Sequence, residues 1–324
     1  MTEPTAEPPF VRPDVAAFLG YLNNLPGPRT YQMTPEEARA AMRGMCDVAD
    51  PPRGTLAVMR DVTIPGPAGP IAGRLFDARE TREPGPALVF FHGGGWVVGD
   101  VDSHASFTAE MARQLDVPVV SVDYRLAPEA PFPAAVEDSE AAARWVADSP
   151  TELGRTVTGL VLSGDSAGGN LSIVVAAALR DAPARVPVIV QAPIYPATDA
   201  TRDYPSFAAF CDGYLLTRET MAWFGGHYRP AADDVRFSPL LGDLTGMPPA
   251  VIVTAGLDPL RDQGRAYAAA LALAGVPVTY QEAAGNIHGF VTLRRAIPSS
   301  QHDVAMYLGA LRAAIDANGA AQPG

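Results

Sequence analysis

A serine between glycines is the first residue of this sequence whose setting suggests chemistry. Ser166 lies in the segment Gly-Asp-Ser-Ala-Gly at 164–168, which matches the Gly-x-Ser-x-Gly pattern of a nucleophile elbow. The glycines of such an elbow permit a sharp, crowded turn from a strand into a helix. The apolar run at 160–162 precedes the turn, and a stretch of helical character, 170–180, follows it. This order predicts that Ser166 is a nucleophile; the alternatives are a phosphate loop, although no Walker-type Gly-Lys-Ser follows, or a plain turn.

A second glycine-rich segment follows the apolar run at 87–91. Residues 92–96 read His-Gly-Gly-Gly-Trp. Three successive glycines let the backbone turn its N–H groups toward one point, and no side chain blocks a substrate oxygen there. Together with the N–H of Ala167, the residue after the serine, the loop would offer donors to a developing oxyanion. A flexible turn is the alternative interpretation.

A serine nucleophile on such an elbow is followed along the chain by an acid and then by a histidine base. Three histidines follow Ser166 in the sequence. His288 comes shortly after a predicted strand and is the candidate base. His227 lies in a predicted insertion and His302 in the last predicted helix, where surface or packing roles are expected.

The candidate acid is Asp258, which follows the predicted strand at 250–255. Asp262 is the second candidate, and an aspartate before a proline also serves as a turn or helix-cap residue. Because the carboxyl ends of parallel strands share one edge of a sheet, we expect Ser166, Asp258 and His288 to converge.

The rest of the sequence supplies the elements that would position these residues. Short apolar or β-branched runs predict strands at 58–64, 71–76, 87–91, 118–123, 160–164, 187–193, 250–255 and 277–282. Apolar residues recurring at three and four predict helices at 104–115, 133–148, 167–181, 262–274 and 302–317. The continuous apolar runs indicate strands buried on both faces, as in a mostly parallel sheet between layers of helices.

Two segments depart from this alternation. Residues 1–50 are predicted to be helical, with Thr34 as an N-cap and Glu37 closing a capping box. Residues 195–247 are rich in aromatic side chains, contain one predicted helix near 217–228, and are expected to form an insertion over the carboxyl edge of the sheet. The predicted organisation is a helical segment at 1–50, a core at 51–194, the insertion at 195–247 and the rest of the core at 248–324.

The composition excludes several function classes. The 324 residues are 48% hydrophobic and 19% charged, as in a well-buried globule. A net charge of −12 without a long basic run argues against nucleic acid. The N-terminus lacks the features of a secretory signal and no long apolar window occurs, so a cytoplasmic protein without a membrane partner is expected. Neither the histidines nor Cys46 and Cys211 show the spacing of a metal site or a disulfide framework, and no metal is expected.

Five segments, in this order, resemble those of the hormone-sensitive-lipase-like esterases, the bacterial family IV lipolytic enzymes, in the subgroup whose elbow reads Gly-Asp-Ser-Ala-Gly. The matching segments are His-Gly-Gly-Gly at 92–95, Asp-Tyr-Arg-Leu-Ala-Pro-Glu at 123–129, the elbow at 164–169, Asp-Pro-Leu at 258–260 and His-Gly-Phe at 288–290. The similarity spans residues 70–320.

The resemblance implies an α/β-hydrolase fold, with a mostly parallel eight-stranded sheet and a small helical cap built from the N-terminal helices and an insertion after the sixth strand. It implies that Gly94, Gly95 and Ala167 supply the oxyanion donors and that His92 supports the loop without being catalytic. It also implies ester hydrolysis without a cofactor, and it suggests a homodimer.

The sequence therefore predicts a serine carboxylesterase that cleaves small-molecule esters of short to medium acyl chains through an acyl-enzyme. The candidate walls of an apolar substrate pocket are Trp96, Phe207, Phe210, Tyr214 and Trp223. Two alternatives stay open. One is an amidase or arylacetamide deacetylase with the same triad. The other is a non-catalytic small-molecule receptor on the same fold, which would be expected to have lost a triad member.

Overall fold

An eight-stranded sheet forms the centre of the molecule, in a computed structural model that describes residues 8–319. The strands are β1 (Val58–Gly66), β2 (Gly69–Asp77), β3 (Gly85–Phe91), β4 (Val119–Asp123), β5 (Val157–Asp165), β6 (Val188–Ile194), β7 (Ala250–Leu257) and β8 (Val278–Ile287). Their order across the sheet is β1-β2-β4-β3-β5-β6-β7-β8. The pairs β1–β2 and β2–β4 are antiparallel, and all later neighbours are parallel. The predicted mostly parallel sheet of eight strands is confirmed.

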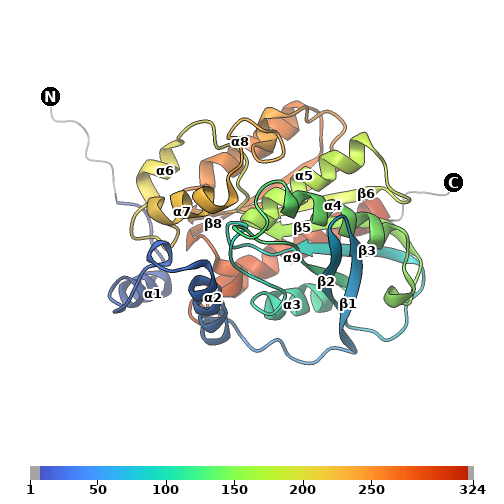
Figure 1. The fold of residues 1–324 in the computed structure, drawn as a ribbon, viewed down its shortest axis with the longest axis horizontal. Helices are drawn as coiled ribbons and strands as arrows, with labels where there is room; N and C mark the ends of the chain where they lie inside the picture. The colour runs from blue at the N-terminus through green and yellow to red at the C-terminus, as the bar shows by residue number, and fades with distance from the viewer. Residues whose placement is uncertain (1–7, 320–324) are drawn as a thin grey trace.

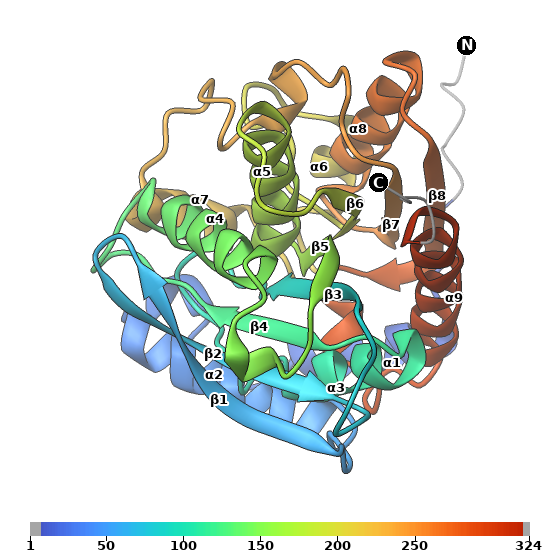
Figure 2. The same cartoon turned by 90° about the vertical axis from the view of Figure 1, so that its right-hand side faces the viewer.

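The central strands are buried because helices cover both faces of the sheet. The helices are α1 (Pro13–Asn23), α2 (Pro35–Ala49), α3 (Ala105–Leu115), α4 (Ala134–Ala147), α5 (Ala167–Asp181), α6 (Pro205–Phe210), α7 (Arg218–Tyr228), α8 (Arg261–Leu273) and α9 (Ser300–Gly319). Figure 2 shows α3 and α9 on one face and α4, α5 and α8 on the other. The apolar runs of β3, β5 and β7 therefore meet helices on both sides, as the sequence predicts.

Four helices gather beyond the carboxyl ends of the parallel strands. Figure 1 shows α1 and α2 from the N-terminus beside α6 and α7 from the segment after β6. Helix α2 begins with the predicted capping box: the Thr34 hydroxyl accepts from the Glu37 N–H at 3.3 Å, and the Glu37 carboxylate accepts from the Thr34 N–H at 2.8 Å. Residues 1–7 and 320–324, which belong to the first and last predicted segments, lie outside the described residues.

Two elements differ from their sequence-based predictions. Helix α6 is additional, because its six residues beginning at Pro205 are too few to show a helical period. Strand β8 extends beyond position 282 to Ile287, through Gly285 in a left-handed conformation (φ 70°) and an irregular register against β7. His288 therefore follows its strand directly and does not lie several residues into a loop.

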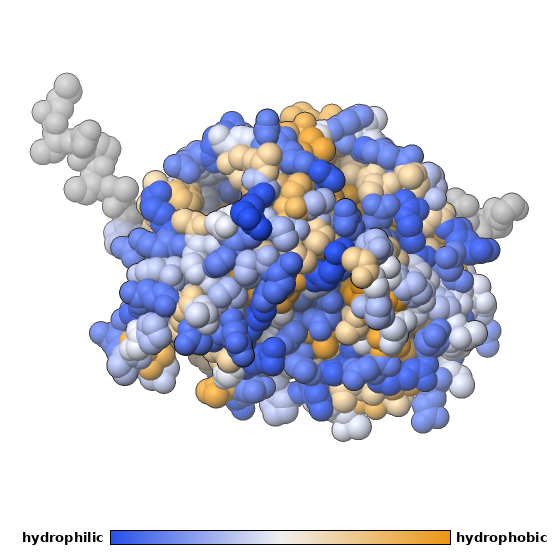
Figure 3. Space-filling view, viewed as in Figure 1, coloured by the Kyte–Doolittle hydropathy of each residue, from blue (hydrophilic) through white to orange (hydrophobic). Residues whose placement is uncertain are grey.

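Among residues 8–319, no helix is both long enough and apolar enough to cross a membrane. On the face seen in Figure 3, hydrophilic and hydrophobic residues are interspersed.

Candidate active site

The turn between β5 and α5 holds Ser166 in a strained backbone conformation, with φ at 55° and ψ at −115°. The glycine positions of the turn, 164 and 168, have no room for a side chain. A β-carbon at Gly168 would lie 1.8 Å from the carbonyl oxygen of Phe91, and one at Gly164 would lie 2.4 Å from the same oxygen. The N–H of Ser166 donates to the carbonyl of Ile194 at 2.9 Å, which fixes the turn against the end of β6. The Gly-x-Ser-x-Gly spacing thus forms an elbow that presents the serine side chain at the edge of the sheet.

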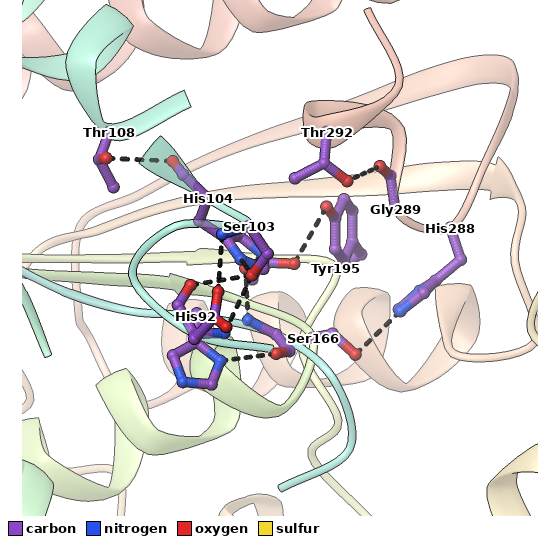
Figure 4. A network of polar contacts seen from close by, with 12 residues as sticks. His92, Ser103, His104, Thr108, Ser166, Tyr195, His288, Gly289 and Thr292 are labelled. Atoms are coloured by element: carbon purple, nitrogen blue, oxygen red, sulfur yellow. Dashed lines mark hydrogen bonds and ion pairs between the residues drawn. The ribbon is translucent and has the colours of Figure 1, made fainter. Parts of the chain in front are cut away.

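Three side chains that lie far apart in the sequence form one hydrogen-bonded row. His288 Nε2 is 2.8 Å from Ser166 Oγ, and His288 Nδ1 is 2.7 Å from Asp258 Oδ2. Asp258 is fully buried, and its other oxygen accepts from the N–H of Leu260 at 2.8 Å. Figure 4 shows Ser166 and His288 pointing toward each other. Because the Asp258 carboxylate only accepts, it requires a proton on Nδ1 and leaves Nε2 free to accept from the serine.

The glycine loop after β3 lies against this row. Gly94 and Gly95 have positive φ values, 114° and 58°. A β-carbon on Gly94 would lie 2.1 Å from the carbonyl oxygen of Val98, so the loop has no room for a side chain at this position. Among the hydrogen bonds between residues 8 and 319, none has the N–H of Gly94, Gly95 or Ala167 as its donor. Three backbone N–H groups near Ser166 are thus left without an acceptor among the described residues.

Behind the loop lies a buried polar network (Figure 4). Asp165 Oδ1 accepts from the N–H of Gly93 at 2.7 Å and forms an ion pair with His104 Nε2 at 3.1 Å. His92 is fully buried and stacks on Tyr124 with ring centroids 4.3 Å apart. Burial, together with the charge of His104, lowers the pKa of His92 to about 4, so His92 is neutral at ordinary pH. His92 contacts the glycine loop and not Ser166. This agrees with the expectation that His92 supports the loop and is not catalytic.

Two cavities meet at Ser166. The first, of about 250 Å³, has Ala167, Trp96 and Phe207 in its walls. The second, of about 210 Å³, has His288 and Gly94 in its walls. Gly95, Leu216 and Phe224 border both cavities, so these residues form the wall between them. The second cavity also shares residues of α2 and of the loop before α7 with a larger groove of about 880 Å³.

The predicted pocket residues divide into two groups. Trp96 and Phe207 border the first cavity. Phe210, Tyr214 and Trp223 border neither cavity at the serine. Phe210 packs with Tyr214 in the cluster beneath α1, and the Trp223 ring contacts His227 with centroids 4.5 Å apart. These three aromatics pack against other side chains and not along the cavities at the serine.

Sequence reasoning missed the residues that line the cavities in their place. They are Leu216, Met221, Phe224 and Phe237 at the first cavity and Met42, Met45 and Leu215 at the second. The spacing of Met221 and Phe224 was a usable signal, because residues three apart share one face of a helix.

The alternative site residues lie elsewhere. Asp262 accepts from the N–H of Ser206 at 2.9 Å and pairs with Arg261 and Arg265, away from His288. His302 is exposed on α9. Within the part of the chain that the structure describes, no group of three or more His, Cys, Asp or Glu residues is arranged to hold a metal ion.

Comparisons with known proteins agree with this geometry. Residues 88–292 match a family described as having an alpha/beta hydrolase fold. The chain is 42% identical over 291 residues to the carboxylic ester hydrolase LipN of Mycobacterium tuberculosis, covering 85% of this chain and 75% of LipN. It is 36% identical over 327 residues to the carboxylesterase NlhH of the same species, covering 98% of this chain and all of NlhH.

Solved structures share the whole fold. LAE6, an alpha/beta hydrolase enzyme from the metagenome of Lake Arreo, superposes with a TM-score of 0.88 at 36% identity and covers 94% of this chain and 98% of its own. A hyperthermophilic esterase from the archaeon Pyrobaculum calidifontis superposes with a TM-score of 0.85 at 35% identity and covers 94% of this chain and 99% of its own. The similarity therefore extends over nearly the whole chain.

Proposed function

Since the chain belongs to the alpha/beta-hydrolase fold family, in its hormone-sensitive-lipase-like branch, we propose that it is a serine carboxylesterase that acts through Ser166, His288 and Asp258. The observation that carries this proposal is the row of hydrogen bonds from Asp258 through His288 to Ser166, which ends where the two cavities meet. A receptor that had lost catalysis would not need this complete row.

In the first half-reaction Ser166 Oγ attacks the ester carbonyl carbon, and His288 Nε2 takes the serine proton. Asp258 holds the imidazole in the required tautomer and stabilises the imidazolium. The carbonyl oxygen becomes an oxyanion that accepts from the N–H groups of Gly94, Gly95 and Ala167, each worth ~3 kcal/mol at this stage. The intermediate collapses as His288 gives its proton to the departing alcohol oxygen, which leaves an acyl-enzyme.

The second half-reaction repeats these steps with water. His288 takes a proton from the water as its oxygen attacks the acyl carbon, and the same three N–H groups stabilise the second oxyanion. The proton then returns to Ser166 Oγ as the acid leaves. No step requires a group beyond these side chains and the backbone.

The position of His288 supports an assignment of the two cavities to the two parts of an ester. The leaving alcohol must receive its proton from His288 Nε2, so the alcohol part belongs to the cavity that His288 borders. The acyl part then belongs to the cavity of about 250 Å³ bordered by Ala167, Trp96 and Phe207. This volume lies below the roughly 300–1,000 Å³ of pockets for drug-sized ligands, which supports short to medium acyl chains.

The alcohol side has more room. Its cavity shares wall residues with the groove of about 880 Å³ between the N-terminal helices and the loop before α7. We therefore expect that a larger alcohol group is tolerated better than a larger acyl group.

The proposal is tested with p-nitrophenyl esters. Ser166→Ala and His288→Ala should each abolish hydrolysis while the far-ultraviolet circular dichroism spectrum stays that of the wild type. Full activity in either variant would overturn the assignment. The acyl-chain assignment fails if rates rise steadily from butyrate to palmitate esters.

The leaving group, the assembly and the location are finer points of the same proposal. Ester specificity predicts that a p-nitrophenyl ester is cleaved much faster than the matched p-nitroanilide; the reverse order would identify an amidase or arylacetamide deacetylase. The family resemblance supports a homodimer, which light scattering after size exclusion tests. The expected cytoplasmic location is tested by cell fractionation.

A further inference from the structure

A buried ion pair beneath the catalytic serine has no place in the mechanism above. His104, at the start of α3, is fully buried, and Asp165, the residue before Ser166, is 4% exposed. His104 Nε2 lies 3.1 Å from Asp165 Oδ1. Figure 4 shows His104 within the network of polar contacts behind Ser166. Buried charges are costly unless they are paired, so this arrangement calls for a reason.

The hydrogen bonds around His104 determine its protonation. The Ser103 hydroxyl donates its one proton to the carbonyl of Asp100 at 2.9 Å, and it accepts from the N–H of the same residue at 2.9 Å. Its oxygen lies 3.0 Å from His104 Nδ1 and can only accept there, so Nδ1 carries a proton. Nε2 lies 3.1 Å from the Asp165 carboxylate oxygen without forming a hydrogen bond, and the charge of that carboxylate favours a proton on Nε2 as well. These contacts favour a proton on each ring nitrogen, that is, an imidazolium.

The surroundings favour this charge. Asp165 from β5, Asp100 from the loop before α3 and Asp50 after α2 are the acidic groups around His104. Burial alone would lower the pKa of His104, but the charge and contact of Asp165 outweigh it and raise that pKa above its ordinary value.

The remaining titratable and charged groups near His104 do not replace it as the partner of Asp165. Arg294 is held by Asp50 at 2.9 Å, and Arg43 lies 2.5 Å from Asp100. The His92 ring, 5.7 Å away, is neutral, and burial raises the pKa of the Cys46 thiol to about 12. Tyr195 donates to Asp165 Oδ2 at 3.4 Å, and burial raises its pKa well above the ordinary value.

Asp165 connects the ion pair to the oxyanion loop. Its Oδ1 accepts from the N–H of Gly93 at 2.7 Å, and a β-carbon at Gly93 would lie 2.3 Å from Oδ2, so the loop is seated directly on the carboxylate. The next two residues of the loop, Gly94 and Gly95, carry the N–H groups proposed to donate to the oxyanion. A carboxylate beside a developing oxyanion would repel it strongly in a poorly solvated site unless a cation cancelled its charge.

We propose that His104 is a positioning residue, held as an imidazolium, that keeps Asp165 ionised as the seat of the oxyanion loop and cancels its charge next to Ser166. This inference rests on the proposed esterase function. It predicts that proton loss from His104 at alkaline pH weakens oxyanion stabilisation and lowers kcat, while KM for the substrate changes little.

The kinetic test compares His104→Gln, which keeps a polar side chain but no charge, with the wild type over a pH series. We expect kcat to fall by about 10-fold or more, within the range for a weakened oxyanion donor, and the alkaline decline of kcat to disappear. His302→Gln, at an exposed histidine on α9, is the matched control and should keep the wild-type profile. An unchanged kcat and alkaline limb in His104→Gln would overturn the proposal.

A double-mutant cycle separates charge compensation from loss of packing. Asp165→Asn alone leaves an unpaired histidine, whereas His104→Gln combined with Asp165→Asn leaves a neutral pair that can still accept from Gly93. We expect the double variant to be more active than His104→Gln alone, because the uncompensated carboxylate is gone. If the fold-decrease of kcat in the double variant equals the product of the fold-decreases in the two single variants, the proposed coupling is contradicted.

Protonation is measured independently of activity by ¹⁵N NMR of the imidazole nitrogens in Ser166→Ala. Two protonated nitrogens at neutral pH, whose signals change in Asp165→Asn, are expected. If the wild type is active but His104 is a neutral tautomer, the positioning role is overturned and the proposed esterase function is not. A wild type that hydrolyses no ester overturns the proposed function and, with it, the positioning role.

Discussion

Phe224 of α7 lies directly against Gly95 of the glycine loop: a β-carbon on Gly95 would come within 2.2 Å of the phenyl ring. The contact joins α7 to the loop that carries the proposed oxyanion donors. It also places one aromatic ring in the wall of both cavities at Ser166. The space for the substrate and the shape of the donor loop are therefore set by the same pair of residues.

Gly95→Ala should lower kcat by about 10²- to 10³-fold, the cost of losing an oxyanion donor. The added methyl group would clash with Phe224, and φ at 58° is strained for alanine. The measurement is kcat for a p-nitrophenyl ester. Gly226→Ala on α7 is the control, because no heavy atom lies within 4 Å of its added carbon; it should keep full activity. A fully active Gly95→Ala variant would show that the loop is not confined as described.

Phe224→Ala should open the wall between the two cavities and move the preference toward longer acyl chains. Removal of the ring would join spaces of about 250 and 210 Å³. The check is the ratio of kcat/KM for octanoate and butyrate esters. The neighbouring Trp223→Ala is the matched control, since Trp223 borders neither cavity. Equal shifts in the two variants would mean that loosening of α7, and not the wall, sets chain length.

The proposed catalytic row could be predicted from the sequence because each of its members follows a strand. Ser166, Asp258 and His288 come directly after β5, β7 and β8, and strand periodicity is a local signal. Parallel strands bring their carboxyl ends to one edge whatever the details of packing. The glycine loop was recognisable for the same reason, as it follows β3.

The pocket walls could not be predicted as well because they depend on non-local packing. Phe210 and Tyr214 are aromatic residues of the segment expected to lie over the site, but they pack against α1. Nothing in the sequence near position 210 indicates that contact with the N-terminal helix. On α7, Phe224 borders both cavities and Trp223 borders neither, although the two residues are adjacent in sequence. The ion pair of His104 with Asp165 joins two segments far apart in the chain, and no spacing pattern connects them.

The ion pair between Glu129 and Arg39 should stabilise the fold at neutral pH and lose its effect in acid. Hydrogen bonds from the Arg39 guanidinium, at 2.6 and 2.8 Å, lower the pKa of Glu129 to about 2 from its ordinary value of 4.5. A lowered folded-state pKa gives stability above the unfolded pKa that disappears as pH falls through the folded one. The pair's contribution is therefore full above pH 4.5 and lost toward pH 2.

Glu129→Gln should lower Tm at neutral pH, and the difference from the wild type should shrink between pH 4.5 and pH 2. Because the Glu129 side chain is 64% exposed, we expect only ~0.5 kcal/mol after solvent screening. Asp148→Asn, at an ion pair exposed on both sides, is the control and should change Tm less. A difference that grows as pH falls would contradict the assigned direction of the pKa shift.

Asp258→Asn and Asp262→Asn, compared side by side, decide which carboxylate orients His288. Asp258 Oδ2 is 2.7 Å from His288 Nδ1, so an amide there can donate to Nδ1 and favour the wrong tautomer, with the proton on Nε2. By analogy with the corresponding change in a serine protease triad, kcat should fall by about 10⁴-fold. Asp262 instead joins α8 to α6 through the N–H of Ser206 at 2.9 Å. Its replacement should cost ~1 kcal/mol in the free energy of unfolding and leave kcat nearly unchanged. Urea unfolding and p-nitrophenyl ester kinetics on both variants make the comparison, and a large loss of kcat in Asp262→Asn with an active Asp258→Asn would transfer the role to Asp262.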